Sequence, residues 1–247
     1  MSTARPTLFL LHGWAMESRI FSPWINALAG DFRCQSWDLP GHGGKPCPPQ
    51  GLDWEESLLT LQGAVEALSR PVVLGWSLGG LFALALALRF PELLGGLVLI
   101  DSSPCFVQRE DWPWALTSSA LDAFAHELLA DGRAVRRRFL ALQTQGDPAA
   151  RAQLAAAQRW PLPDPRCLLD GLQLLRDKDL RPQLRPLPFP VLILQGEADR
   201  IVPPAAARQL QSSLAGSRLQ LLKAGHAPFL SHPEACSQAL RSTFYHD

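Results

Sequence analysis

The chain has 247 residues, 47% of them hydrophobic, which is enough for one large domain with a substantial core. Lys and Arg together number 23, and so do Asp and Glu, so the formal net charge is zero. A neutral chain has no overall field to attract nucleic acid or a membrane surface, and we expect neither as a partner.

The cysteines and the first residues indicate a cytoplasmic protein. The five cysteines are scattered and never form a Cys-x-x-Cys pair, which is typical of reduced thiols. Residues 1–6 carry no charged-then-apolar leader, and no apolar run approaches the roughly 20 residues of a bilayer span. We expect no metal or cofactor, because potential ligands do not cluster at metal-binding spacings and no Gly-x-Gly-x-x-Gly register occurs.

Six short apolar runs predict β-strands. Most are nearly continuous rather than alternating, as expected for parallel strands buried on both faces. The runs cover residues 7–11, 34–39, 71–76, 97–102, 190–195 and 218–223.

Helical stretches separate these runs, notably residues 53–68 and 79–90. Asp53, followed three residues later by Glu56, is typical of a capping box, and Pro203-Pro204 suits the first turn of a helix. The alternation of strands and helices predicts an α/β fold: a mainly parallel, doubly wound sheet of about six strands with helices on both faces.

The stretch between the fourth and fifth strands is too long for a simple crossover. Residues 103–188 carry helical periodicity and predict an inserted helical cap, leaving residues 1–102 and 189–247 as the α/β core. Helices are expected near residues 118–129, 133–144, 148–159 and 166–176, with proline clusters around the last of them.

A strained serine turn is predicted at residues 75–80, which read Gly-Trp-Ser-Leu-Gly-Gly behind the apolar run 71–74. A serine on a sharp strand-to-helix turn needs glycine on both sides so that strand and helix can close around it. Taken alone, the pattern also fits a glycine-rich turn with an incidental serine. The rest of the chain favours Ser77 as a catalytic nucleophile.

A base and an acid for Ser77 are expected at other strand ends, because catalytic groups in open α/β sheets gather at the carboxyl ends of the strands. Asp199 follows the fifth predicted strand and His226 the sixth. We assign His226 as general base and then acid, and Asp199 as the carboxylate that holds its imidazole. Glu197 and Asp101 are rival carboxylates; Asp101 ends the fourth strand and could reach the same imidazole.

The oxyanion hole is expected from two backbone N–H groups. Leu78 follows the nucleophile and Trp14 follows the first strand, so both are placed to donate to a developing oxyanion. His12, just before Trp14, is interpreted as a structural hydrogen-bonding residue.

The cap segment is strongly basic between residues 132 and 160, where six arginines face one acid, Asp147, for a net charge of +5. Either a solvated helix face or a docking surface for an acidic partner explains this distribution. The helix near residues 133–144 also places Phe139, Leu142 and Gln143 on one face, a pattern that periodicity alone assigns to ordinary cap packing before any binding role.

Several of these stretches resemble one group of α/β-hydrolase carboxylesterases, which hydrolyse the methyl ester of pimeloyl-[acyl-carrier protein] in biotin biosynthesis. The order Ser, Asp, His is that of the α/β-hydrolase triad. The more specific matches are Ser-Ser-Pro-Cys-Phe at 102–106 and Phe-Leu-Ala-Leu-Gln-Thr at 139–144, the second lying in the cap. Further matches are Leu11–Trp14, Asp38–Gly41, Leu74–Leu81 and Gly225–Phe229.

The resemblance implies a serine carboxylesterase with Ser77, Asp199 and His226 as its triad and acyl carrier protein as the partner that brings the ester. It also implies docking of that acidic carrier on the cap arginines Arg133, Arg137, Arg138 and Arg151. The substrate-binding residues that it implies are Trp14, Leu78, Phe139, Leu142, Gln143 and His226.

Two other functions stay open at this point. One is a general short-chain carboxylesterase without carrier specificity, and the other is a non-hydrolytic ligand-binding protein of the same fold. We expect a monomer in each case.

Overall fold

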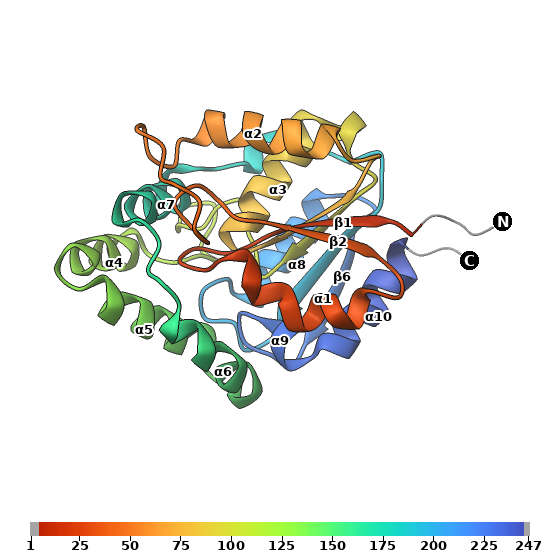
Figure 1. Cartoon of the computed structure of the whole chain (residues 1–247). Helices are drawn as coiled ribbons and strands as arrows, with labels where there is room; N and C mark the ends of the chain where they lie inside the picture. The colour runs from red at the N-terminus through yellow and green to blue at the C-terminus, as the bar shows by residue number, and fades with distance from the viewer. Residues whose placement is uncertain (1–4, 245–247) are drawn as a thin grey trace.

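One parallel sheet of six strands forms the centre of the computed structural model, which describes residues 5–244 (Figure 1). The strands lie in the order β2-β1-β3-β4-β5-β6, and every neighbouring pair is parallel. They are β1 (Thr7–Leu11), β2 (Arg33–Trp37), β3 (Val72–Trp76), β4 (Gly96–Ile100), β5 (Val191–Gly196) and β6 (Arg218–Leu222). The six predicted strands are therefore confirmed, with ends shifted by one or two residues.

The central strands explain the continuous apolar runs. Strands β3, β4 and β5 are buried at every residue, whereas the edge strands β2 and β6 are mostly exposed or half-buried. Strand β2 ends at Trp37, two residues before its predicted end, because the Leu39 N–H donates to His12 Nε2 and Pro40 has no N–H to give.

Helices cover both faces of the sheet, as predicted (Figure 1). On one face α2 (Trp54–Glu66), α3 (Leu78–Arg89) and α8 (Pro204–Ser213) pack on apolar side chains such as those of Phe9 and Val73. On the other, α1 (Ser22–Leu28), α9 (Pro228–Ser231) and α10 (Pro233–Phe244) pack on side chains such as those of Leu10 and Leu74. Short 3₁₀ helices, Ser18–Phe21, Pro91–Leu93 and Arg181–Gln183, join these elements.

The helix starts follow the capping residues. The Asp53 carboxylate accepts the Glu56 N–H at 2.9 Å at the start of α2, which bears out that half of the predicted capping box. Helix α8 begins with Pro204, as the proline pair predicts.

Four helices lie between β4 and β5 and gather at one end of the molecule, where α4 to α7 extend past the sheet (Figure 1). They are α4 (Ser118–Ala130), α5 (Gly132–Gln143), α6 (Pro148–Leu154) and α7 (Pro165–Asp177). The predicted helix 148–159 is divided: α6 ends at Leu154 and a 3₁₀ helix covers Ala155–Arg159. Aspartates cap α5, α6 and α7, and residues 103–188 are called the cap segment below.

Among the described residues, none of the helices combines the length and apolar character that a bilayer crossing requires.

Candidate active site

Ser77 occupies the strained turn between β3 and α3. Its backbone has φ 54° and ψ −119°, a conformation that residues with a side chain rarely adopt. A Cβ on Gly75 would lie 2.3 Å from the Gly79 carbonyl oxygen, and a Cβ on Gly79 would lie 2.3 Å from that of Leu11. The glycines are therefore required by close backbone approach, which is the steric reason the sequence pattern predicted.

Two hydrogen bonds hold the turn on the neighbouring strand. The Ser77 N–H donates to the Ile100 carbonyl at 3.0 Å, and Ser102 Oγ donates to the Ser77 carbonyl at 2.8 Å. Because Ile100 and Ser102 belong to or follow β4, the strained serine is fixed by the sheet rather than by the turn alone.

Asp199 and His226 meet although they are 27 residues apart. His226 Nδ1 lies 2.7 Å from Asp199 Oδ2, and both side chains are buried. Asp199 Oδ1 also accepts the N–H groups of Ile201 and Val202 at 2.8 and 3.1 Å. These hydrogen bonds orient the carboxylate on the imidazole.

The indole of Trp76 joins the nucleophile turn to the histidine loop. Trp76, the residue before Ser77, donates from Nε1 to the His226 carbonyl at 2.6 Å, and the two rings lie 5.7 Å apart. His226 Nε2 is buried and has no hydrogen-bond partner among the described residues. A buried, unpaired imidazole nitrogen beside the Ser77 turn is a suitable proton acceptor.

Asp101 and Glu197, the rival carboxylates, do not bind the imidazole. Glu197 is exposed, and Asp101 is fully buried at the end of β4, where it accepts the Gly196 N–H at 2.7 Å. Burial, and then the negative charge of Asp199, raise the pKa of Asp101 well above its usual range. The raised pKa favours the protonated, neutral form of Asp101.

Leu78 and Trp14, the residues predicted to form the oxyanion hole, both belong to segments that adjoin Ser77. Leu78 is the first residue of α3, where N–H groups have no intrahelical acceptor. Trp14 follows Gly13, whose added Cβ would lie 3.1 Å from Ser77 Cβ, so this loop passes directly beside the serine.

His12 fixes the loop that carries Trp14. Its Nε2 accepts the Leu39 N–H at 3.0 Å, so Nδ1 carries the proton and donates to the Gly13 carbonyl at 2.8 Å. Burial, assisted by neighbouring His42, lowers the pKa of His12 to about 3. His12 is thus a neutral structural residue, as predicted.

Trp14 also reaches the cap segment with its side chain. The indole Nε1 donates to the Leu168 carbonyl at 2.8 Å, and the ring meets that of Phe139 edge-to-face at 4.8 Å. A Cβ on Gly171 would lie 2.8 Å from Trp14 Cδ1 and 3.5 Å from Leu78 Cδ2. The structure thus gathers the predicted apolar contacts Trp14, Leu78 and Phe139, with Leu142 packed against the same core.

Gln143 brings polar atoms to this apolar wall. Its carbonyl accepts the His226 N–H at 2.9 Å, and its side-chain Nε2 and Oε1 are buried without a partner among the described residues. An unpaired buried amide is costly, so these two atoms are open to a polar partner.

Comparison with known proteins decides the family. Residues 8–239 match the sequence profile of the Alpha/beta hydrolase family. The chain belongs to the alpha/beta hydrolase family. The pimeloyl-[acyl-carrier protein] methyl ester esterase of Nitrosomonas europaea is 41% identical over 244 residues, with 95% of each chain covered. The proteins of the same name from Aromatoleum aromaticum and Stenotrophomonas maltophilia (strain R551-3) are 41% and 39% identical, covering 94% and 96% of this chain and 96% and 92% of theirs.

Solved structures agree on the alpha/beta hydrolase fold. An esterase from Exiguobacterium antarcticum superposes with a TM-score of 0.89 at 25% identity, covering 97% of this chain and 91% of the other. A bromoperoxidase from Bacillus anthracis gives a TM-score of 0.88 at 20% identity, with 97% and 92% covered, which shows the fold alone.

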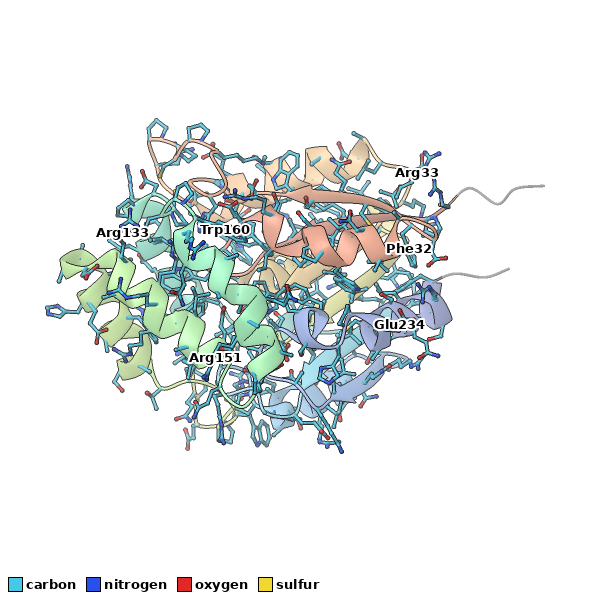
Figure 2. All side chains as sticks on the ribbon, turned by 60° about the horizontal axis from the view of Figure 1, so that its bottom comes forward. Phe32, Arg33, Arg133, Arg151, Trp160 and Glu234 are labelled. Carbon is cyan, nitrogen blue, oxygen red and sulfur yellow. The ribbon has the colours of Figure 1, made fainter. Side chains whose placement is uncertain are left out.

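The surface of this alpha/beta hydrolase is basic over α5 and α6. Arg133, Arg137, Arg138 and Arg151 are exposed, as is Arg159, and Figure 2 shows Arg133 and Arg151 at the end of the molecule opposite Arg33 and Glu234. Arg138 pairs with Glu127, and Arg137 lies 4.0 Å from Asp131, whereas Arg133 and Arg151 form no ion pair with a described residue.

Arg136 does not belong to that surface. Its side chain is buried and donates to the carbonyls of Gln158, Trp160 and Pro161 at 2.7 to 2.9 Å. Asp147 is buried too, so residues 132–160 expose five arginines and no acid. The uneven charge that the sequence shows is therefore sharper on the folded surface.

The fold brings together one group of potential metal ligands that spacing along the sequence did not indicate. Ligand atoms of Cys47, Asp164 and Cys167 lie within 4.8 Å of one another, beside a hollow of about 600 Å³ between the loop after β2 and the cap segment. Spacing along the chain could not reveal this, because 119 residues separate the two cysteines (167 − 47 − 1). The other group at ligand distance, Asp101, Asp199 and His226, includes two residues of the predicted triad.

Three residues of the site were not predicted. Gln195 donates to the Val202 carbonyl and to Asp199 Oδ2, while Trp76 and Ser102 hold His226 and Ser77 through the bonds described above. The position of Gln195 at the end of β5 is the one signal that could have drawn attention to it.

Proposed function

We propose that this protein is a carboxylic ester hydrolase that converts pimeloyl-[acyl-carrier protein] methyl ester and water into pimeloyl-[acyl-carrier protein] and methanol in biotin biosynthesis. The Asp199–His226 hydrogen bond beside the strained Ser77 turn carries the case for serine ester hydrolysis. The case for this ester comes from relatives of that name, which are about 40% identical over nearly the whole chain.

In the proposed reaction Ser77 Oγ attacks the methyl ester carbonyl carbon, and His226 Nε2 takes the serine proton. The N–H groups of Trp14 and Leu78 donate to the oxyanion that forms. His226 then protonates the leaving methoxide, methanol departs, and the acyl group stays on Ser77. Asp199 stabilises the imidazolium through its bond to Nδ1.

Water completes the cycle by the same groups. His226 Nε2 takes a proton from water as its oxygen attacks the acyl carbonyl, and it returns that proton to Ser77 Oγ when the tetrahedral intermediate collapses. The product is a free carboxylate at the distal end of the acyl chain, which stays attached to its carrier. No cofactor or metal takes part in these steps.

The cap segment supports recognition of a long, tethered acyl chain. We propose that residues 103–188 form a cap on a core of residues 1–102 and 189–247, and that Trp14, Leu78, Phe139 and Leu142 contact the methylene chain. Gln143 would bind a polar group near the ester. The apolar wall fits the acyl chain because burial of each methylene is worth about 0.8 kcal/mol.

The exposed arginines support docking of an acidic acyl carrier protein. A mainly positive patch attracts an acidic partner at long range, and Arg133 and Arg151 form no ion pair with a described residue. We propose that Arg133, Arg137, Arg138 and Arg151 form this docking surface, and that the enzyme is a cytoplasmic monomer.

Methanol release from the carrier-linked ester tests the reaction. Ser77→Ala should lower turnover by at least about 10⁴-fold, because the nucleophile is lost while binding remains. Ser213→Ala, at an exposed serine of α8, is the matched control and should retain wild-type turnover. Turnover by the Ser77 variant at the wild-type rate would refute the assignment, and a folded enzyme that fails to react with a fluorophosphonate at Ser77 would favour a binding protein.

Salt dependence separates carrier-specific from general esterase activity. The double variant Arg133→Ala, Arg151→Ala should raise KM for the carrier-linked ester about tenfold at low salt and leave a small soluble ester unaffected. Arg208→Ala on α8 removes an exposed arginine outside the cap segment and should change neither KM. Equal salt sensitivity for the two substrates would support a general short-chain esterase instead.

A further inference from the structure

Asp147 is a buried carboxylate outside the catalytic triad. It lies at the N-cap of α6 and is 4% exposed. Oδ1 accepts the Ala150 N–H at 3.0 Å, while Oδ2 accepts the Gly225 N–H at 3.0 Å and the Ser231 hydroxyl at 2.7 Å. No cation among the described residues pairs with it, so these three hydrogen bonds satisfy its buried oxygens.

The two oxygens of this carboxylate serve different parts of the molecule. Oδ1 caps a helix of the cap segment, and Oδ2 holds the loop and short helix on either side of His226, although Gly225 is 78 residues away in the chain. Helix capping alone needs one acceptor, which a serine or asparagine also supplies. The second set of bonds is what requires a carboxylate.

The backbone N–H groups of Gly225 and His226 both donate to acceptors in the cap segment. Gly225 donates to Asp147, and His226 donates to the Gln143 carbonyl at 2.9 Å. The carbonyl of His226 instead accepts from Trp76 in the core. The backbone of His226 is therefore bound on both sides: its N–H to the cap segment and its carbonyl to the core.

Gly225 packs closely against the cap segment. A Cβ at this position would lie 2.8 Å from the Gln143 carbonyl oxygen and 3.3 Å from Asp147 Cβ. The histidine loop is thus pressed against the corner between α5 and α6, so a movement of that corner must displace the loop.

We propose that Asp147 is a positioning residue for His226, so that the general base is correctly placed only while the corner between α5 and α6 sits on the histidine loop. The inference rests on the proposed function, because it takes His226 as the base of ester hydrolysis. It makes the cap segment a part of the catalytic apparatus in addition to a lid over the substrate.

Asp147→Ser separates the two roles of the side chain. Serine is as good an N-cap as aspartate, but its hydroxyl is too short to cap α6 and hold Gly225 together. With a small soluble ester as substrate, we expect kcat to fall at least about tenfold and KM to stay within about twofold, because orientation of the base acts on the transition state. Asp147→Asn, which keeps one carbonyl oxygen, should fall between wild type and the serine variant.

Asp131→Ser is the matched control. Asp131 caps α5 in the same way, accepting the Ala134 N–H at 2.9 Å, but it is exposed and makes no contact with the histidine loop. This control should keep wild-type kcat. Thermal unfolding of all three variants checks that the fold is retained.

The proton on His226 Nδ1 gives a readout that a purely structural role would leave unchanged. In wild type its downfield NMR signal reports the bond to Asp199; we expect it to shift or broaden in Asp147→Ser and to persist in Asp131→Ser. A folded Asp147→Ser enzyme with wild-type kcat and an unchanged signal would overturn the proposal. If wild type itself fails to hydrolyse the carrier-linked methyl ester, the proposed function fails. The NMR comparison still decides whether Asp147 positions His226.

Discussion

Two carboxyl groups lie buried beside His226, and they differ in their hydrogen-bond partners. Asp199 accepts two backbone N–H groups and lies 2.7 Å from the imidazole Nδ1. Asp101 has one backbone donor, and its Oδ2 is unpaired among the described residues. Burial, and then the nearby Asp199, raise the pKa of Asp101, and this favours the neutral acid at this position.

We predict that Asp101→Asn keeps the fold and becomes progressively more stable than wild type as pH rises from 5 to 8. The folded state raises the pKa of Asp101, so it retains a proton that the unfolded chain has lost at neutral pH. Wild-type stability from this group therefore falls as pH rises above the usual aspartate value, and asparagine removes that dependence. Urea unfolding across this pH range measures it; an advantage that is constant with pH would contradict it.

Two glycines make a second test at the residue scale. Gly79→Ala should abolish activity and lower the unfolding free energy by more than about 3 kcal/mol, because its Cβ would meet the Leu11 backbone at 2.3 Å. Gly63 lies inside α2 with nothing within 4 Å of an added Cβ, so Gly63→Ala should stabilise the protein by about 0.5–1 kcal/mol. Chemical denaturation of both variants tests the pair, and equal effects would refute the steric argument.

At the scale of elements, the predictable features are those that a local pattern dictates. The strands follow from apolar runs, the helix starts from Asp53 and Pro204, and the Ser77 turn from glycines whose spacing the geometry requires. The order of Ser77, Asp199 and His226 could be read because each follows a strand whose carboxyl end lies at the same edge of the sheet.

Features that depend on a distant partner could not be predicted. Arg136 resembles its arginine neighbours in sequence, but the ending of the 3₁₀ helix near Trp160 supplies carbonyls that bury it. Asp147 looks like one more helix cap, and its bond to Gly225 depends on how α6 sits on the core. Asp101 and Asp199 were separable only once their donors were known.

At the scale of the whole molecule, the site is closed. Ser77, Asp199 and His226 are 2%, 4% and 0% exposed, so the proposed ester can reach them only when side chains that cover the site move. The hydrogen bonds between cap and core at Leu168 and Gly225 are among those that such a movement would strain or break.

The buried pair His12 and His42 predicts loss of stability in acid. Burial lowers the pKa of His12 to about 3 and that of His42 to about 4, so both are neutral in the folded protein and become charged near pH 6.5 when it unfolds. Their contribution is present above pH 6.5 and is lost as pH falls toward 4. Thermal unfolding between pH 7.5 and 4.5 should show this decline, and His42→Gln should reduce it; a flat profile in wild type would contradict the assignment.

The hydrogen bonds from the histidine loop to both cap and core also limit how the cap of such an enzyme can be exchanged, by engineering or in evolution. A cap is the obvious module to exchange when a new acyl group is wanted, because it forms one continuous segment of the chain. Here the exchange would remove the acceptors of the Gly225 and His226 amides together with the old specificity. A transplanted cap would have to supply equivalents of Gln143 and Asp147. The segment that sets substrate selectivity therefore also has to keep the histidine in place.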